Sequence, residues 1–144
     1  MISLPNPTKT LYTEHSSDND MTTETFADFC ATQDARNTIQ LNVTKYTLML
    51  CDALLDNFNS RNGGGTSDYK FYIESGRKYH KIIMETGAGS RSVHAIVDRK
   101  TGEVFKPASF KAPAKHVRFN LLIIEQREWL LQHADWAGGY LYKR

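Results

Sequence analysis

The stretches of sequence that decide the fold are YKFYIES (residues 69–75), YHKIIMET (79–86) and RSVHAIVD (91–98). In each stretch apolar and polar residues alternate, which is typical of a β-strand with one buried face. Tight connections separate these stretches from each other and from a further extended run over residues 103–106. Gly102 suits the left-handed position of a bulged hairpin loop. The pattern therefore predicts a four-stranded antiparallel meander.

Helical patterns precede the strands. The clearest helix covers residues 43–59, where apolar residues recur at three- and four-residue steps along two lines. A helix with this pattern is mostly buried. A shorter helix is expected over residues 22–34, and residues 31–37 are expected to lead from it toward the second helix.

The segment after the strands reads as a C-terminal helix. Residues 115–131 are expected to be mostly helical, although Phe119 to Ile124 fits a strand equally well. Tyr140 to Tyr142 is expected to be extended. The predicted fold class is α+β: an N-terminal helix packed on a four-stranded antiparallel meander, followed by a C-terminal helix. Residues 1–20 are expected to form a flexible N-terminal arm, and residues 21–144 a single α+β domain.

Composition excludes several classes of protein. A chain of 144 residues that is 40% hydrophobic and 24% charged suits one soluble globular domain, and its apolar runs are too short to span a membrane. Cys30 and Cys51 cannot form a disulfide framework and are expected to be small buried hydrophobes. His80 is expected to be a hydrogen-bonded core residue. Because metal-ligand, phosphate-loop and nucleophile-elbow spacings are missing, the sequence predicts no metal, no cofactor and no enzymatic activity.

Charge is segregated along the chain. Residues 61–118 hold twelve Lys/Arg against five Asp/Glu, a net charge of +7, whereas residues 1–60 hold three against eight, a net charge of −5. A local excess of positive charge attracts polyanions. The alternative is a solvated basic face that serves solubility.

The outward face of the predicted sheet mixes cations with aromatic rings. By alternation it carries Lys70, Tyr72, Tyr79, Lys81, His94 and, less regularly, Phe105. Single-stranded nucleic acid is bound by this mixture, because bases stack on rings and phosphates meet cations. Ordinary strand composition, or a protein contact, explains the same residues. With the cations of the neighbouring turns and loops, the candidate nucleic-acid-binding residues are Lys70, Tyr72, Arg77, Lys78, Tyr79, Lys81, Arg91, Lys106 and Lys111.

A basic run, KPASFKAPAKHVR (residues 106–118), follows the last predicted strand and contains no acid. Its prolines favour an extended loop that tracks a phosphate backbone. The alternative, which fits the sequence equally well, is a loop that Phe110 packs across the sheet while its lysines stay in water.

Two stretches carry a resemblance: SVHAIVDRKTGEVFKPASFKAPAK (residues 92–115) and ADWAGGYLY (134–142). Together they resemble a family of small proteins of marine tailed phages, especially phages of cyanobacteria. The resemblance covers roughly residues 69–142. It implies a phage origin and the cytoplasm of an infected bacterium, or the virion, as the place of action. It implies no particular activity.

In architecture alone, a helix leading into a curved four-stranded meander is similar to single-strand nucleic-acid binders of the positive-cofactor or whirly type. We therefore expect a small phage accessory protein that binds single-stranded nucleic acid. The alternative is a factor that binds a host or phage protein, indicated by the aromatic C-terminal segment from Trp136, which docks either on its own core or on a partner. Homodimerisation through the sheet edge or this segment stays open, and no membrane contact is expected.

Overall fold

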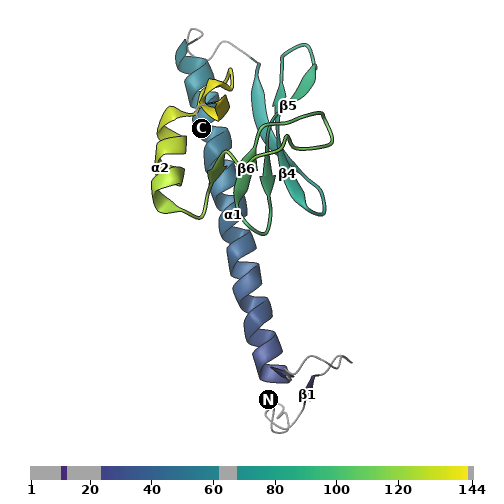
Figure 1. Cartoon of the computed structure of the whole chain (residues 1–144). Coiled ribbons are helices and arrows are strands. Elements are labelled where there is room, and N and C mark those ends of the chain that lie inside the picture. The colour runs from purple at the N-terminus through teal and green to yellow at the C-terminus, as the bar shows by residue number, and fades with distance from the viewer. Residues whose placement is uncertain (1–10, 13–23, 62–67, 143–144) are drawn as a thin grey trace. The chain divides into compact units, whose positions relative to one another are not determined.

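The computed structural model describes residues 11–12, 24–61 and 68–142 (Figure 1). The chain divides into two compact units, Met1–Thr38 and Ile39–Arg144. The predicted N-terminal arm lies outside the described residues except for Leu11 and Tyr12.

The first unit contains a short pairing and the start of a long helix. Strand β1 (Leu11–Tyr12) pairs antiparallel with β2 (Glu24–Thr25), and helix α1 (Phe26–Arg61) follows. Thr25 caps the helix, because its Oγ1 accepts a hydrogen bond from the backbone N–H of Asp28 at 3.1 Å.

The predicted connection over residues 31–37 is wrong, because α1 runs through it without a break. This stretch, ATQDARN, contains neither glycine nor proline. Its alanines, glutamine and arginine favour a helix, so nothing local ends α1 there.

The second unit is built on a five-stranded antiparallel sheet with the order β3-β4-β5-β6-β7. The strands are β3 (Lys70–Ser75), β4 (Tyr79–Glu85), β5 (Arg91–Asp98), β6 (Glu103–Phe105) and β7 (Phe119–Asn120). The first four confirm the predicted meander. The fifth, β7, occupies the start of the stretch for which strand and helix were both open, and it pairs with β6.

The β5–β6 turn has the predicted form. Gly102 adopts φ +79°, and Asp98 Oδ1 accepts hydrogen bonds from the backbone N–H groups of Lys100 (2.8 Å) and Thr101 (3.1 Å). The aspartate side chain thus satisfies donors that the reversing backbone leaves unpaired.

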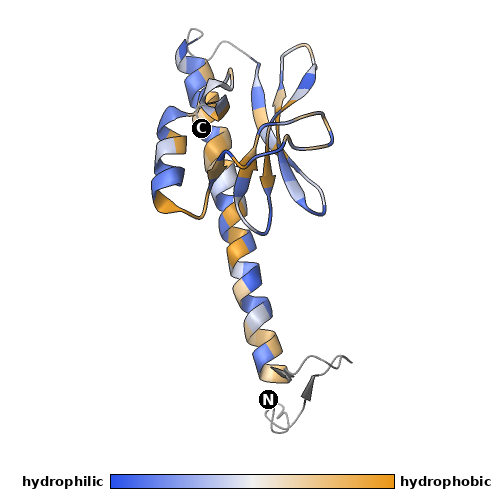
Figure 2. Ribbon diagram, in the orientation of Figure 1, coloured by the Kyte–Doolittle hydropathy of each residue, from blue (hydrophilic) through white to orange (hydrophobic). Residues whose placement is uncertain are grey.

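The hydrophobic core lies between α1 and one face of the sheet. From α1 it takes Val43, Leu50 and Leu54, and from the sheet Ile82 and Val97, all of them fully buried. Figure 2 shows hydrophobic and hydrophilic residues alternating along the strands and interleaved along α1. The chain therefore has the predicted α+β fold, with the N-terminal helix packed on an antiparallel sheet.

Helix α2 (Ile124–His133) and a 3-10 helix, η2 (Gly139–Tyr142), complete the unit. The prediction that residues 140–142 are extended is wrong. Gly138 takes φ +87° and its carbonyl accepts from the N–H of Leu141 at 3.1 Å, which closes a helical turn. Tyr140 and Leu141 are each 2% exposed, so the C-terminal segment docks on its own core.

Within the part of the chain that the structure describes, no helix is both long and apolar enough to cross a membrane.

Candidate nucleic-acid interface

The side of the sheet turned away from α1, called the outer face here, carries the predicted candidates from the strands. Strand pairing places Tyr72 opposite Ile83 and Lys81 opposite Ile96, whereas the core residue Ile82 faces the other way. Because side chains alternate along a strand, Lys70, Tyr72, Tyr79 and Lys81 share the outer face. Phe105 joins them, since it pairs with Ile96.

His94 was expected on this face, and that expectation is wrong. The register between β4 and β5 shifts between Ile82 and Ile83, so one extra residue of β5 interrupts the alternation. The imidazole of His94 is turned to the core side, where its Nε2 lies 2.8 Å from the hydroxyl of Tyr140. Burial lowers the pKa of His94 to about 4, although Asp135 opposes the shift.

His80 has the predicted role of a hydrogen-bonded core residue. It is 3% exposed, and its Nδ1 and Nε2 lie 2.6 Å from Ser75 Oγ and 3.0 Å from Thr44 Oγ1. Thr44 donates its hydroxyl proton to the carbonyl of Gln40 (2.9 Å), so His80 Nε2 must carry the proton in this contact. Burial, reinforced by the charge of Arg99, lowers the pKa of His80. His80 therefore links α1 to β3 as a neutral ring.

The middle of the outer face is covered by the basic run that follows β6. Pro107 and Pro113 form an isolated antiparallel bridge, and the N–H of Ala114 donates to the carbonyl of Lys106 at 2.8 Å, so this run is a closed loop. Ile83 and Ile96 are fully buried on the outer face, outside the core that α1 covers. The loop therefore packs across the sheet, which was one of the two alternatives.

Phe110, at the tip of this loop, is 42% exposed and has cations beside its ring. The Nζ of Lys81 lies 5.1 Å and the guanidinium carbon of Arg91 5.7 Å from the ring centroid. Both distances are within the range of a cation–π interaction. Lys111, the next residue in the loop, is exposed.

Two glutamates offset part of the positive charge of the outer face. Arg91 Nη2 donates to Glu74 Oε2 at 2.5 Å, and this hydrogen bond raises the pKa of Arg91. The hydroxyl of Tyr72 donates to Glu85 Oε1 at 2.7 Å, which raises the pKa of Tyr72. The strands themselves are thus near charge balance, and the excess of positive charge comes from turns and loops.

A second basic group lies where the β3–β4 and β5–β6 turns meet. The N–H of Arg99 donates to the carbonyl of Lys78 (3.0 Å), and Arg99 Nη1 donates to the carbonyl of Gly76 (2.6 Å). These bonds bring Arg77 and Lys78 next to Arg99 and Lys100. Arg99 and Lys100 were not among the predicted site residues, although an antiparallel meander puts its first and third turns at the same end of the sheet.

Aromatic rings adjoin this turn pair. The Nζ of Lys78 lies 5.3 Å from the ring centroid of Tyr79, and the ring of Tyr79 meets that of Phe105 edge-on with centroids 6.5 Å apart. Both rings are half-buried, so they present part of their surface to solvent.

The predicted residues therefore fall into three groups rather than one. The turn group holds Arg77, Lys78 and Tyr79, and the loop group surrounds Phe110 with Lys81, Arg91 and Lys111, flanked by Lys70 and Tyr72 on β3. Along β4, Tyr79 of the turn group and Lys81 of the loop group are two residues apart, about 7 Å, so these two groups adjoin. Lys106 is apart from both groups, because its Nζ lies 4.0 Å from the ring centroid of Tyr142 in the C-terminal segment.

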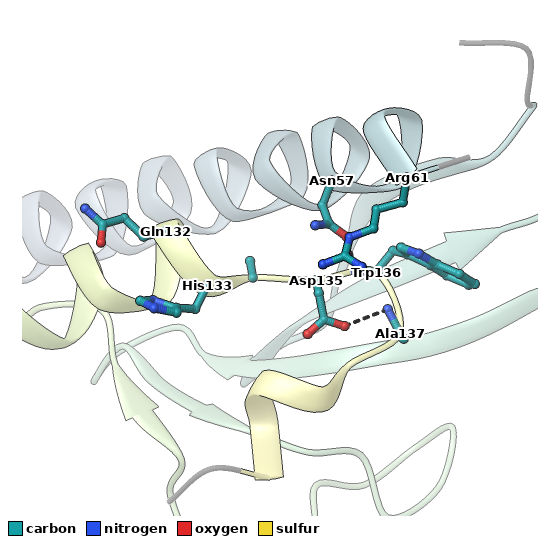
Figure 3. A pocket seen from close by; sticks show the side chains of 8 residues that line it. Asn57, Arg61, Gln132, His133, Asp135, Trp136 and Ala137 are labelled. Atoms are coloured by element: carbon teal, nitrogen blue, oxygen red, sulfur yellow. Dashed lines mark hydrogen bonds between the residues drawn. The ribbon is translucent and has the colours of Figure 1, made fainter. Parts of the chain in front are cut away.

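A polar cleft of about 480 Å³ lies where the ends of α1 and α2 meet the C-terminal segment (Figure 3). Its walls carry both charges, Arg61 and Asp135. Asn57 Oδ1 accepts from the backbone N–H of Trp136 at 3.0 Å, and Asp135 Oδ1 accepts from that of Ala137 at 3.0 Å. The first bond holds the C-terminal segment against α1 and the second closes a turn within that segment, so we assign Asn57 and Asp135 to the fold.

Comparison with known proteins identifies a family without indicating an activity. No curated protein and no solved structure matches the chain. The model of a family of unknown function, DUF7717, matches residues 26–143, which include α1, the whole sheet and α2. The chain therefore belongs to the DUF7717 family.

Proposed function

We propose that the protein binds single-stranded nucleic acid on the outer face and is not an enzyme. The observation that carries the proposal is the exposed ring of Phe110 beside the cations of Lys81 and Arg91. An aromatic ring beside cations is the unit that single-strand binders repeat, since one nucleotide offers a flat base and a charged phosphate. Stacking of one base on such a ring contributes about 1–3 kcal/mol.

The turn pair supplies a second contact point at the end of the sheet. Arg77, Lys78, Arg99 and Lys100 lie on two hydrogen-bonded turns beside the ring of Tyr79. A single strand of nucleic acid that runs from Phe110 toward these turns contacts aromatic rings and cations at both places. Contacts of this kind read the backbone and the flat faces of bases, so they favour binding with little sequence preference.

The ion pair between Arg91 and Glu74 does not prevent a phosphate contact. Both side chains are partly exposed, at 38% and 47%. An exposed ion pair stabilises a fold by only about 0–1 kcal/mol. Arg91 can therefore exchange this carboxylate for a phosphate at small cost.

The experiment is a fluorescence-anisotropy titration of the full chain with a labelled single-stranded oligonucleotide over a range of salt concentrations. Each phosphate contact to a single strand contributes a slope of about −0.7 to a plot of log K against log salt. The double variant Arg77→Gln/Lys78→Gln should reduce the slope by about 1.4. Phe110→Leu keeps an apolar cover over the sheet but removes the ring, so it should weaken binding by about 1 kcal/mol or more without changing the slope.

Lys45→Gln is the matched control. Lys45 is an exposed lysine of α1 that lies over a tyrosine ring, 5.7 Å from the centroid of Tyr46, and it is not on the outer face. Its loss should leave the titration unchanged. If the wild-type protein shows no salt-sensitive binding, or if Lys45→Gln lowers affinity as much as the double variant, the outer face is not a nucleic-acid site.

The setting of this activity rests on the resemblance of residues 92–115 and 134–142 to phage proteins. On that basis we propose a phage accessory protein that acts in the cytoplasm of the infected bacterium. The alternative, a factor that binds a host or phage protein, drew on the aromatic C-terminal segment. Because Tyr140 and Leu141 are buried in the protein's own core, that segment no longer favours it. If the protein is purified from infected cells together with one stoichiometric protein partner that survives nuclease treatment, this result would favour the protein-binding alternative.

A further inference from the structure

A cavity of about 250 Å³ lies between the C-terminal segment and the end of the sheet where β5 begins and β6 ends. Three of the residues that line it carry aromatic rings: His94 from β5, and Trp136 and Tyr142 from the C-terminal segment. Typical pockets for drug-sized ligands measure about 300–1,000 Å³. This cavity is smaller, so it suits a single planar ring system.

The charge of the cavity selects the ligand further. Among the described residues that line it, Lys106 is the one cation and none is acidic. His94 adds no charge at pH 7, because burial lowers its pKa to about 4. Lys106 is half-buried with its ammonium 4.0 Å from the ring centroid of Tyr142, so it stands over an aromatic wall. A flat ligand with a negative group beside it matches this arrangement.

We propose that this cavity binds one nucleotide, with the base against Trp136 and Tyr142 and the phosphate on Lys106. The inference deepens the proposed function, since the nucleotide can belong to a single strand held on the protein. A free nucleotide has the same chemistry, and the experiment separates the two sources. Lys106, which belongs to neither the turn group nor the loop group of the outer face, then has a binding role of its own.

The tryptophans provide a local probe of the cavity. Trp136 lines it, whereas Trp129 stacks on Phe119 and His133 with centroid distances of 5.5 and 4.0 Å and is not in its walls. These are the two tryptophans of the chain. A Trp129→Phe protein therefore reports on the cavity through the fluorescence of Trp136 alone.

The test titrates Trp129→Phe with adenosine, with adenosine 5′-monophosphate and with a short oligothymidylate. We expect saturable quenching of Trp136, with the monophosphate bound more tightly than the nucleoside. Adding Lys106→Gln should remove that preference for the phosphate. Adding Tyr142→Ala, which truncates a side chain that is 68% exposed, should weaken binding about fivefold or more. The control Lys45→Gln, at a second lysine–tyrosine pair, should change nothing.

The outcomes keep this inference apart from the proposed function. Absence of saturable quenching by all three ligands overturns the cavity as a nucleotide site. So does an affinity for the monophosphate in the Lys106→Gln and Tyr142→Ala proteins that equals that of the parent Trp129→Phe protein. If an oligonucleotide binds by anisotropy but leaves Trp136 unchanged, the cavity proposal fails and the outer-face proposal stands. If the monophosphate quenches and no oligonucleotide binds, the cavity is a site for free nucleotides and the proposed function fails.

Discussion

Replacing His94 should flatten the dependence of stability on pH. The imidazole packs edge-on against Phe71 with centroids 5.9 Å apart and stacks on Tyr140 at 5.6 Å, and burial lowers its pKa to about 4. An unfolded histidine has a pKa of about 6.5. Between these two values the unfolded chain binds a proton that the folded protein does not.

The sign and size of the effect follow from proton linkage. Stability due to the neutral buried ring is fully present above about pH 6.5 and is lost as the pH falls toward 4. Each pKa unit corresponds to about 1.36 kcal/mol, so the whole window amounts to about 3 kcal/mol. Between pH 7 and pH 5 the wild-type protein should lose about 2 kcal/mol through this residue.

The assay is urea unfolding of the wild type and of His94→Gln at pH 7, 6 and 5. The variant loses ring contacts and starts lower at pH 7, but its free energy of unfolding should fall by about 2 kcal/mol less across the range. His80 is present in both proteins, so its contribution cancels in the difference. Parallel curves for His94→Gln and the wild type would refute the assignment of a buried neutral ring.

Three further changes test the turn, the thiols and the outer face. Gly102→Ala should lower the free energy of unfolding, measured in urea, by at least about 1 kcal/mol. The residue has φ +79°, and a Cβ there would lie 3.0 Å from Leu122 Cγ. An unchanged free energy of unfolding would contradict this geometry. Ellman's reagent at pH 8 should modify Cys30, which is partly exposed, and should not modify Cys51. Cys51 is 4% exposed, and burial raises the pKa of its thiol to about 12. If both thiols react equally fast, Cys51 is accessible to the reagent. Tyr79→Ala should weaken binding of a single-stranded oligonucleotide by about 1–3 kcal/mol and leave the fold intact, whereas unfolding would show that Tyr79 belongs to the core.

Most of the sheet could be predicted because its signals are local. Alternation along β3, β4 and β5 has a period of two residues, and the Asp98 to Gly102 turn carries its own hydrogen-bonding side chain. The strand β7 has only two residues, and it is a strand because it pairs with β6. The basic run of residues 106–118 separates these two strands in the sequence. A pattern within so short a segment cannot distinguish strand from helix.

The errors at the candidate site have a different cause. Alternation assigns a face to each residue only while the register is kept, and the shift between Ile82 and Ile83 turned His94 inward. No residue type in this stretch marks the shift. The grouping of Arg99 with Lys78, by contrast, follows from the order of the turns and was within reach of the sequence. The pairing of Lys106 with Tyr142 joins residues far apart in the chain, so only the folded structure brings it out.

The loop that carries Phe110 is part of the fold as well as of the proposed interface. Ile83 and Ile96 are fully buried on the side of the sheet that α1 does not cover, so without this loop both side chains would face water. Burial of one such side chain contributes about 1.5–3 kcal/mol. Removal of the loop would therefore expose apolar surface and abolish binding through unfolding, whatever the loop contacts. This is why the ring of Phe110 must be exchanged for leucine rather than deleted with its loop. A loss of binding in a protein that unfolds at the same urea concentration as the wild type can then be assigned to the ring.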